Sequence, residues 1–160
     1  MTKTGSIAVA FLILGTVASG SAAPPSTAPI AIDGHVEHAL QLTIAALRAM
    51  PQQAIDVTFT SGKGPQSDHF TGALLWDVVQ KAGITDGADA AAKHHLQHAL
   101  LVTGRDGYTV AVSIGEIDPA FEGKSVILAD DDADTGVRLV VPGDKQGGRN
   151  VRDVVRIEIE

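Results

Sequence analysis

Three arginines in the last quarter of the chain have the chemistry to bind an anion: Arg138, Arg149 and Arg152. A guanidinium group offers a planar fork of N–H donors that matches two oxygens of a phosphate, a carboxylate or another oxyanion. The alternative is ion pairing within the chain. The carboxylates that we consider as partners are those of Asp130, Asp131, Asp132, Asp134 and Asp144. We favour ion pairing as the default role of arginines in a chain rich in carboxylates.

A glycine-rich segment supplies a second candidate anion site. Ser61, Gly62, Lys63 and Gly64 combine a hydroxyl, a lysine ammonium and two flexible glycines, and successive backbone N–H groups in such a loop can form a small anion nest. A segment with two glycines is also typical of a plain turn. Lys63 is the residue that would distinguish the two, because it alone adds a full positive charge.

Histidines form the third candidate site. His94 and His98 are four residues apart, so they would share one face of a helix, and His95 lies between them. Neutral imidazole is a good ligand for zinc or copper, and the site would need completion from elsewhere in the chain. The histidines that could complete it are His35, His38 and His69. The simpler interpretation is a group of surface histidines without a metal.

Composition limits the possible functions. The chain has 160 residues, 44% of them hydrophobic, and a formal net charge of −7. We do not expect nucleic acids or anionic membrane surfaces as partners of such an acidic chain, because binding to them depends on clusters of Lys and Arg and no basic stripe is visible. The sequence contains no cysteine. A disulfide, a thiolate nucleophile, an iron–sulfur cluster and a cysteine-ligated metal are therefore excluded as well.

The N-terminal segment has the layout of a secretory signal peptide. Lys3 precedes an apolar run over residues 7–17, and small residues follow it up to residue 23. We predict a signal peptide over residues 1–23, a flexible Pro- and Ser-containing leader over 24–29, and a periplasmic or secreted protein with no membrane association after cleavage. The apolar run is shorter than the roughly 20 residues that a membrane-spanning helix needs.

The remaining residues, 30–160, predict one α+β domain with a mixed, largely antiparallel sheet and short helices. Alternating or β-branched segments predict strands at 30–36, 55–60, 99–103, 108–112, 126–129, 137–141 and 151–159. Helical spacing predicts helices at 42–50, 70–82 and 113–117, with Thr43 as a cap of the first and Gly83 as the stop of the second. Residues 61–69 are expected to form a loop, residues 30–36 an edge strand or hairpin, and Tyr108 to pack in the core.

Several segments, taken in order, resemble the sulfite-oxidase-like molybdopterin-binding domain family. The segments are 42–51, 55–60, 70–79, 106–108, 127–129, 138–143 and 150–159. The resemblance covers nearly the whole chain from residue 30. It implies an oxidoreductase fold that holds a molybdenum–pterin cofactor, with Ser61, Lys63, Arg138, Arg149 and Arg152 as the candidate cofactor-binding residues.

Two departures from the family pattern bear on the chemistry. Catalytic members of the family bind molybdenum through a cysteine in the loop after the strand that resembles 55–60, and here that loop begins with Ser61. A serine hydroxyl is a harder and less acidic ligand than a thiolate. The excursion before Arg138 is also reduced to the acidic sequence ADDDADTG. The first departure excludes cysteine ligation of molybdenum and leaves only oxygen ligation by Ser61, and the second predicts a reduced pocket.

We therefore expect a non-catalytic binding or accessory module that takes a small anionic ligand or a pterin, or that binds no cofactor at all. One alternative is an active molybdopterin-dependent oxidoreductase, or a redox-chain accessory with a redox partner protein, that uses a ligand other than cysteine. The other alternative is a periplasmic metal-binding protein that uses His94, His95 and His98.

Overall fold

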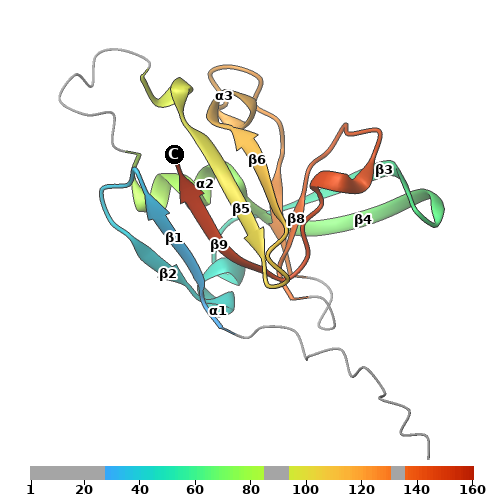
Figure 1. Ribbon diagram of the computed structural model, residues 1–160, viewed down its shortest axis with the longest axis horizontal. Coiled ribbons are helices and arrows are strands. Elements are labelled where there is room, and N and C mark those ends of the chain that lie inside the picture. Colours follow the sequence, from blue (N-terminus) through green and yellow to red (C-terminus); the bar gives the residue numbers. More distant parts are fainter. Residues whose placement is uncertain (1–27, 85–93, 131–135) are drawn as a thin grey trace, which may run out of the picture.

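The computed structural model describes residues 28–84, 94–130 and 136–160. A five-stranded sheet has the order β2-β1-β9-β5-β6 (Figure 1). Its strands are β1 (Ile30–Gly34), β2 (Leu40–Leu42), β5 (Ala99–Gly104), β6 (Thr109–Ser113) and β9 (Val154–Ile159). β1 and β9 pair in parallel, and the other neighbours pair antiparallel. The C-terminal strand β9 is therefore central to this sheet, with Ile157 and Ile159 at most 1% exposed.

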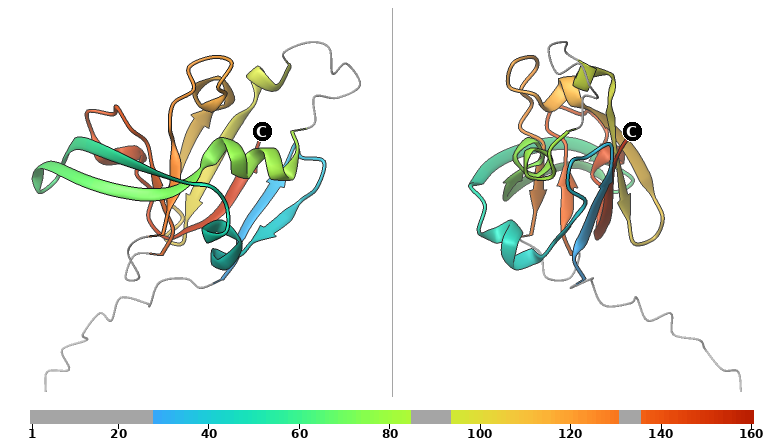
Figure 2. Two further views of the ribbon diagram at one scale, coloured as in Figure 1. Left: turned by 180° about the vertical axis from the view of Figure 1, so that it is seen from behind. Right: turned by 90° about the vertical axis from the view of Figure 1, so that its left-hand side faces the viewer.

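A second sheet has four antiparallel strands in the order β3-β4-β7-β8. Its strands are β3 (Gln52–Ser61), β4 (Gly64–Leu74), β7 (Ile127–Ala129) and β8 (Arg138–Val140). β3 and β4 form a long hairpin that extends beyond the five-stranded sheet (Figure 2), and the loop before β9 contacts it near its tip. Gly72 lets β7 approach β4 closely, since a Cβ there would lie 2.3 Å from the Leu128 carbonyl oxygen.

The helices are short and cover one side of the five-stranded sheet and the loops between strands. They are α1 (Ile44–Arg48), α2 (Leu75–Ala82) and α3 (Ile114–Ile117), with 3-10 turns η1 (His94–Gln97) and η2 (Gly147–Arg149). The predicted cap of α1 is confirmed, because Thr43 Oγ1 accepts a hydrogen bond from the Ala46 N–H at 3.1 Å. Gly83 follows α2 with φ of +68°, as a helix stop requires.

The core consists of two clusters. The larger one joins the five-stranded sheet to α1, α2 and one face of the four-stranded sheet, including Leu75, Val79 and Leu139. The smaller one lies on the opposite face of the four-stranded sheet. Its buried members are Val57, Phe70, Ile127, Ala129 and Val140, and Ile55, Phe59 and Leu74 pack against them while partly exposed. The alternation of β7 between the two clusters explains why Ile127, Leu128 and Ala129 are all buried.

Four predictions of local structure were wrong. The segment 64–74, predicted as a loop and the start of a helix, is strand β4, so that α2 begins only at Leu75. The strands form two sheets instead of one. The final strand begins at Val154 and not at residue 151. Tyr108, predicted to pack in the core, is 52% exposed.

Other predictions are confirmed or fall outside the described residues. Residues 30–34 form the expected hairpin with β2, although β1 also pairs with β9 and so is not an edge strand. The predicted signal peptide at 1–23 and the leader as far as residue 27 lie outside the described residues, as does most of the acidic loop, 131–135. Within the described residues, no helix is both long enough and apolar enough to span a membrane.

Candidate functional site

A cleft of about 460 Å³ lies between the tip of the β3–β4 hairpin and the loop that precedes β9. The hairpin contributes residues 59–62, the loop contributes residues 146–148 with Asn150, and the side chains of Arg138 and Arg152 complete the lining. None of these described lining residues is acidic, although the chain has 19 acidic residues against 12 basic ones. The cleft is therefore a site of positive charge in an acidic protein.

Main-chain and side-chain contacts hold the loop against the hairpin. The Thr60 N–H donates to the Lys145 carbonyl oxygen at 2.9 Å, and Thr60 forms an isolated parallel bridge with Gln146. The Phe59 ring lies against the backbone of Gly147, where an added Cβ would be 2.6 Å from the ring. Gly147 is required there because any side chain would displace Phe59 from the wall of the cleft.

Asn150 connects the loop to the end of β8. Its Oδ1 accepts a hydrogen bond from the Val141 N–H at 2.9 Å. This contact fixes the orientation of the Asn150 amide, which lines the cleft. Because Oδ1 bonds to Val141, the two N–H donors of the amide point away from Val141. An amide donor held in this way suits an oxygen-rich ligand.

The two arginines of the cleft are held differently. Arg138, at the start of β8, places its guanidinium carbon 5.1 Å from the centroid of the Phe70 ring, a cation–π distance. Arg152 is exposed at the rim, and its side chain makes no ion pair or hydrogen bond with any residue that the structure describes. Two of the three predicted arginines thus converge on one cleft.

Arg149 is committed to ion pairs outside the cleft lining. It donates from Nε and Nη2 to the two carboxylate oxygens of Asp144, at 2.8 and 2.7 Å, and from Nη1 and Nη2 to those of Glu116, at 3.1 and 3.0 Å. Lys124 Nζ also lies 2.6 Å from Glu116 Oε1. Arg149 is therefore ion-paired and does not line the cleft. Asp144 is one of the partners that the sequence suggested for it.

This network shifts the pKa of each carboxyl group. The hydrogen bonds from Arg149 hold the pKa of Asp144 below its ordinary value, against a smaller opposing effect of burial. For Glu116, burial raises the pKa, but the hydrogen bonds from Arg149 and Lys124 together outweigh it and the net shift is downward. The same contacts raise the pKa of Arg149. The network therefore fixes η2, and with it the loop side of the cleft, to α3.

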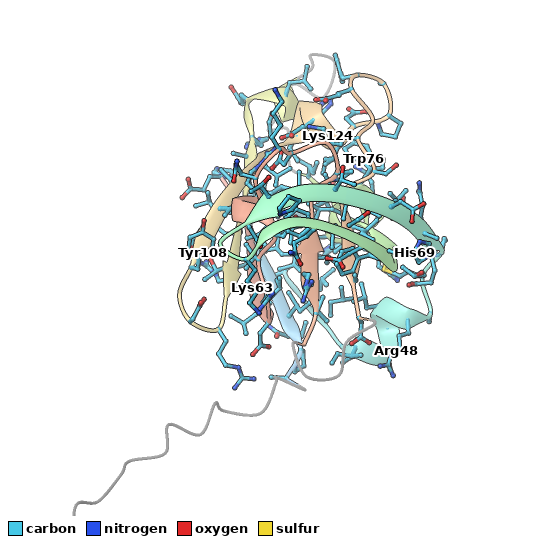
Figure 3. The ribbon with its side chains drawn as sticks, turned by 90° about the vertical axis from the view of Figure 1, so that its right-hand side faces the viewer. Arg48, Lys63, His69, Trp76, Tyr108 and Lys124 are labelled. Carbon is cyan, nitrogen blue, oxygen red and sulfur yellow. The ribbon has the colours of Figure 1, made fainter. Side chains whose placement is uncertain are left out.

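The two predicted residues at the hairpin tip have different surroundings. Ser61 lines the cleft, and its Oγ donates to the Gly64 carbonyl oxygen at 3.3 Å and accepts from the Lys63 N–H at 3.1 Å. Both bonds belong to the hairpin turn. Lys63 is exposed, is not part of the cleft lining and makes no ion pair with a described residue. In the view of Figure 3, Lys63 and Tyr108 lie toward the left and His69 lies at the right.

The histidine side chains that the structure describes have different partners. His95 Nε2 lies 3.0 Å from Asp118 Oδ2, whereas His98 Nδ1 lies 2.7 Å from the main-chain oxygen of Glu160 and its ring is 5.1 Å from that of His35. His69 pairs with Asp56 on the hairpin, and His94 begins η1. Across the described ranges, no three His, Asp or Glu side chains gather as a metal site requires.

Sequence reasoning did not identify the loop residues Gln146, Gly147, Gly148 and Asn150 as part of the site. The adjacent glycines were the available signal, since a glycine pair marks a position where backbone approaches another group closely. Phe59 packs against the smaller core cluster, and its ring also lies against the backbone of Gly147.

No protein-family model matches the chain, and no curated protein matches it. Solved structures do match, among them the crystal structure of the sulfane dehydrogenase SoxCD from Paracoccus pantotrophus, with a TM-score of 0.66 at 18% sequence identity. The match covers 82% of this chain and 38% of that chain, so this chain spans less than half the length of its structural relative. The likeness is one of fold. Together with the two sheets and short helices, it confirms the predicted α+β, sulfite-oxidase-like fold class.

Proposed function

We propose that this chain is an exported, non-catalytic binding module whose cleft takes a small oxyanion or the anionic group of a larger ligand such as a pterin phosphate. One observation carries the proposal. In a chain of net charge −7, the described residues lining the cleft include two arginines and no carboxylate. Such a separation of charge favours an anionic ligand.

The donors of the cleft suit oxygen acceptors. Arg138 and Arg152 supply guanidinium groups, and Asn150 supplies an amide whose oxygen is already bonded to the Val141 N–H. Guanidinium groups bind phosphate and carboxylate oxygens in pairs, and hydrogen bonds to a charged acceptor are about twice as strong as neutral ones. None of the described lining residues has a carboxylate that could act as a general base.

The resemblance in sequence and the likeness of fold support a distant relationship to the molybdopterin-binding oxidoreductases. The residues of the cleft do not fit molybdenum ligation, however. A thiolate ligand is excluded because the chain has no cysteine, and the Ser61 hydroxyl already donates its proton to the Gly64 carbonyl oxygen within the turn. The cleft fits the anionic part of such a cofactor better than it fits the metal, and for this reason we propose binding without molybdenum chemistry.

The experiment uses the chain without residues 1–23, produced in a host that makes molybdopterin, and measures molybdenum, pterin and bound anion. Titration with inorganic phosphate and sulfate follows, by calorimetry. We expect anion binding that Arg152→Ala weakens about tenfold or more, since a hydrogen bond to a charged group contributes about 1.5–3 kcal/mol. Arg156→Ala is the matched control, because Arg156 pairs with Asp33 and Glu158 in the five-stranded sheet and is not part of the cleft lining.

Two results would contradict the proposal. Equal phosphate and sulfate affinities for the Arg152→Ala variant and the unmodified chain would remove the cleft as the anion site. Stoichiometric molybdenum that is lost in Ser61→Ala would establish the alternative of an active oxidoreductase with a serine ligand.

A further inference from the structure

The outer edge of β3 has backbone hydrogen-bonding groups that no described residue satisfies. β3 is the first strand in the order of its sheet, so only one of its edges pairs with β4. The Thr60 N–H donates outward, to Lys145. Because outward and inward groups alternate along a strand, the N–H and C=O groups of Ala54, Asp56 and Thr58 also point outward. Within the described part of the chain, none of these six groups has a partner.

We propose that this open edge binds an extended segment of a partner protein by strand addition, with an acidic residue of that segment beside Lys145. The proposal is independent of the oxyanion cleft, because it rests on the outer edge of β3 and not on Arg138 or Arg152. A length of five residues, from Ala54 to Thr58, corresponds to roughly 16 Å of strand. The segment that fits is therefore short, about five to seven residues.

The chain already begins such a pairing. Lys145 and Gln146 lie beside Thr60 as a single parallel bridge, and no further described residue continues along the edge toward Ala54. An added strand would occupy the edge from Ala54 to Thr58, and the end beside Thr58 would lie next to Lys145. One end of the partner segment would therefore meet the lysine, and whether this is its N-terminal or its C-terminal end depends on the direction of the added strand.

The two faces of β3 define the side chains of the partner. On one face, Ile55 and Phe59 are only partly buried at the margin of the smaller core cluster, next to buried Val57. Apolar side chains of an added strand would extend this cluster and cover its margin. On the other face, Asp56 accepts a hydrogen bond from His69 at 2.8 Å, among exposed residues. The partner segment should therefore alternate apolar and uncharged polar residues.

Charge specifies the end of the segment. Lys145 is exposed, has no ion pair with a described residue, and lines a hollow of about 460 Å³ with Thr58, Phe59, Thr60, Pro65, Gln66 and Gln146. This set contains no acidic residue. Asp or Glu at the end of the partner segment would complement Lys145 and would lie away from Asp56.

The test uses the chain without residues 1–23, labelled with nitrogen-15, and four capped synthetic peptides. Two have an alternating Thr-Val core with a Glu pair at the C-terminal end or at the N-terminal end, and two have Lys in place of Glu. We expect one of the Glu peptides to slow amide hydrogen exchange of Ala54, Asp56 and Thr58 about tenfold at 90% saturation. The peptide that does so also reports the direction of the added strand.

Variants separate the edge from other surfaces. Thr58→Pro removes an outward N–H without removing a β3–β4 hydrogen bond, so binding should be lost, whereas Thr58→Val keeps the N–H and should bind normally. Lys145→Glu should weaken the Glu peptide about two- to fivefold and make the Lys peptide the better ligand. This charge exchange keeps the proposal testable even if Thr58→Pro fails to fold.

Three outcomes would overturn the proposal. The first is no slowing of exchange at the three amides with millimolar peptide. The second is a preference for the Glu peptide that Lys145→Glu does not change. The third is protection of the same amides that depends on protein concentration without peptide, which would assign the edge to a second copy of this chain.

Discussion

Replacing Arg149 by methionine should destabilise the fold by about 2 kcal/mol. Arg149 makes four hydrogen bonds to the carboxylates of Asp144 and Glu116. Hydrogen bonds to charged groups contribute about 1.5–3 kcal/mol each when buried, but exposed ion pairs contribute only about 0–1 kcal/mol. The side chains are 32% exposed for Arg149, 21% for Asp144 and 14% for Glu116, so the network lies between these limits.

Methionine is chosen because it retains the apolar stem of the side chain while removing the charge and all donors. Urea denaturation monitored by Trp76 fluorescence gives the free energy of unfolding, and a loss of about 2 kcal/mol corresponds to a fall in Tm of roughly 4–8 °C for a chain of this size. Arg105→Met is the matched control. Arg105 pairs through Nε with Asp153 and is 43% exposed, so its replacement should cost at most about 1 kcal/mol.

The pH dependence of this difference tests its cause. The pKa values of Glu116 and Asp144 lie below their ordinary values of 4.5 and 3.8 in the folded chain. A carboxyl group whose pKa is lowered on folding stabilises the fold above the unfolded pKa, and this stabilisation is lost as the pH falls through the folded pKa. The difference in the free energy of unfolding between the unmodified chain and Arg149→Met should thus be largest at pH 7 and should become smaller below about pH 4. A gap that is the same at pH 7 and pH 3, or no larger than that of Arg105→Met, would refute this account.

Three further perturbations have defined outcomes. The pKa of Lys124 is raised chiefly by its hydrogen bond to Glu116, so Lys124 stabilises the fold below its unfolded pKa. The free energy of unfolding in urea should therefore decline as the pH rises above about 10.5. The decline should be smaller in Lys124→Met. Thr43→Ala removes the cap of α1 and should cost about 1 kcal/mol in the same assay. Gly72→Ala should lower the free energy of unfolding several times more than Gly62→Ala. A Cβ at Gly72 would lie 2.3 Å from a β7 carbonyl oxygen, whereas a Cβ at Gly62 would meet nothing within 4 Å. Equal thermal stabilities of the two variants would contradict this.

Elements with local signals were predictable from the sequence. Thr43 and Gly83 delimit helices through contacts with residues only a few positions away, and the Asp106-Gly107 turn connects β5 to β6 as its sequence indicates. These positions need no knowledge of the tertiary structure, because a cap or a tight turn is satisfied within one turn of chain.

Strand β4 lacked such a signal. Its first half, from Gly64 to His69, is polar because both of its faces are largely exposed on the extended hairpin, and an exposed strand shows no alternation of apolar residues. The ten residue pairs that it forms with β3 hold this segment in a strand conformation instead. The division into two sheets was equally unpredictable, since the parallel pairing of β1 with β9 joins segments from opposite ends of the chain.

The candidate site was predictable in residue type and not in grouping. Arg138, Arg149 and Arg152 are equivalent in the sequence, because all three lie near aspartates. They differ in the structure since Glu116, which is 33 positions from Arg149, completes a second pair of hydrogen bonds on that residue alone. Ser61 joins Arg138 and Arg152 only because the hairpin returns its tip to the loop before β9.

The distribution of ion pairs explains how an acidic chain can have a cationic corner. Five basic residues are paired with carboxylates of the described chain: Arg48, Arg105, Lys124, Arg149 and Arg156. No such pair is seen within the described chain for Lys63 at the hairpin tip or for Lys145 and Arg152 in the adjoining loop. Lys81 on α2 also has no carboxylate partner among the described residues.

Screening in physiological salt limits the reach of these charges to about 8 Å. A small anion or a short acidic segment bound at the hairpin tip would lie within that distance of the unpaired cations. A polyanion such as DNA extends well beyond it and would also meet the acidic remainder of a surface with net charge −7. For this reason we expect a small anionic ligand, and not a nucleic acid, as the partner of this corner.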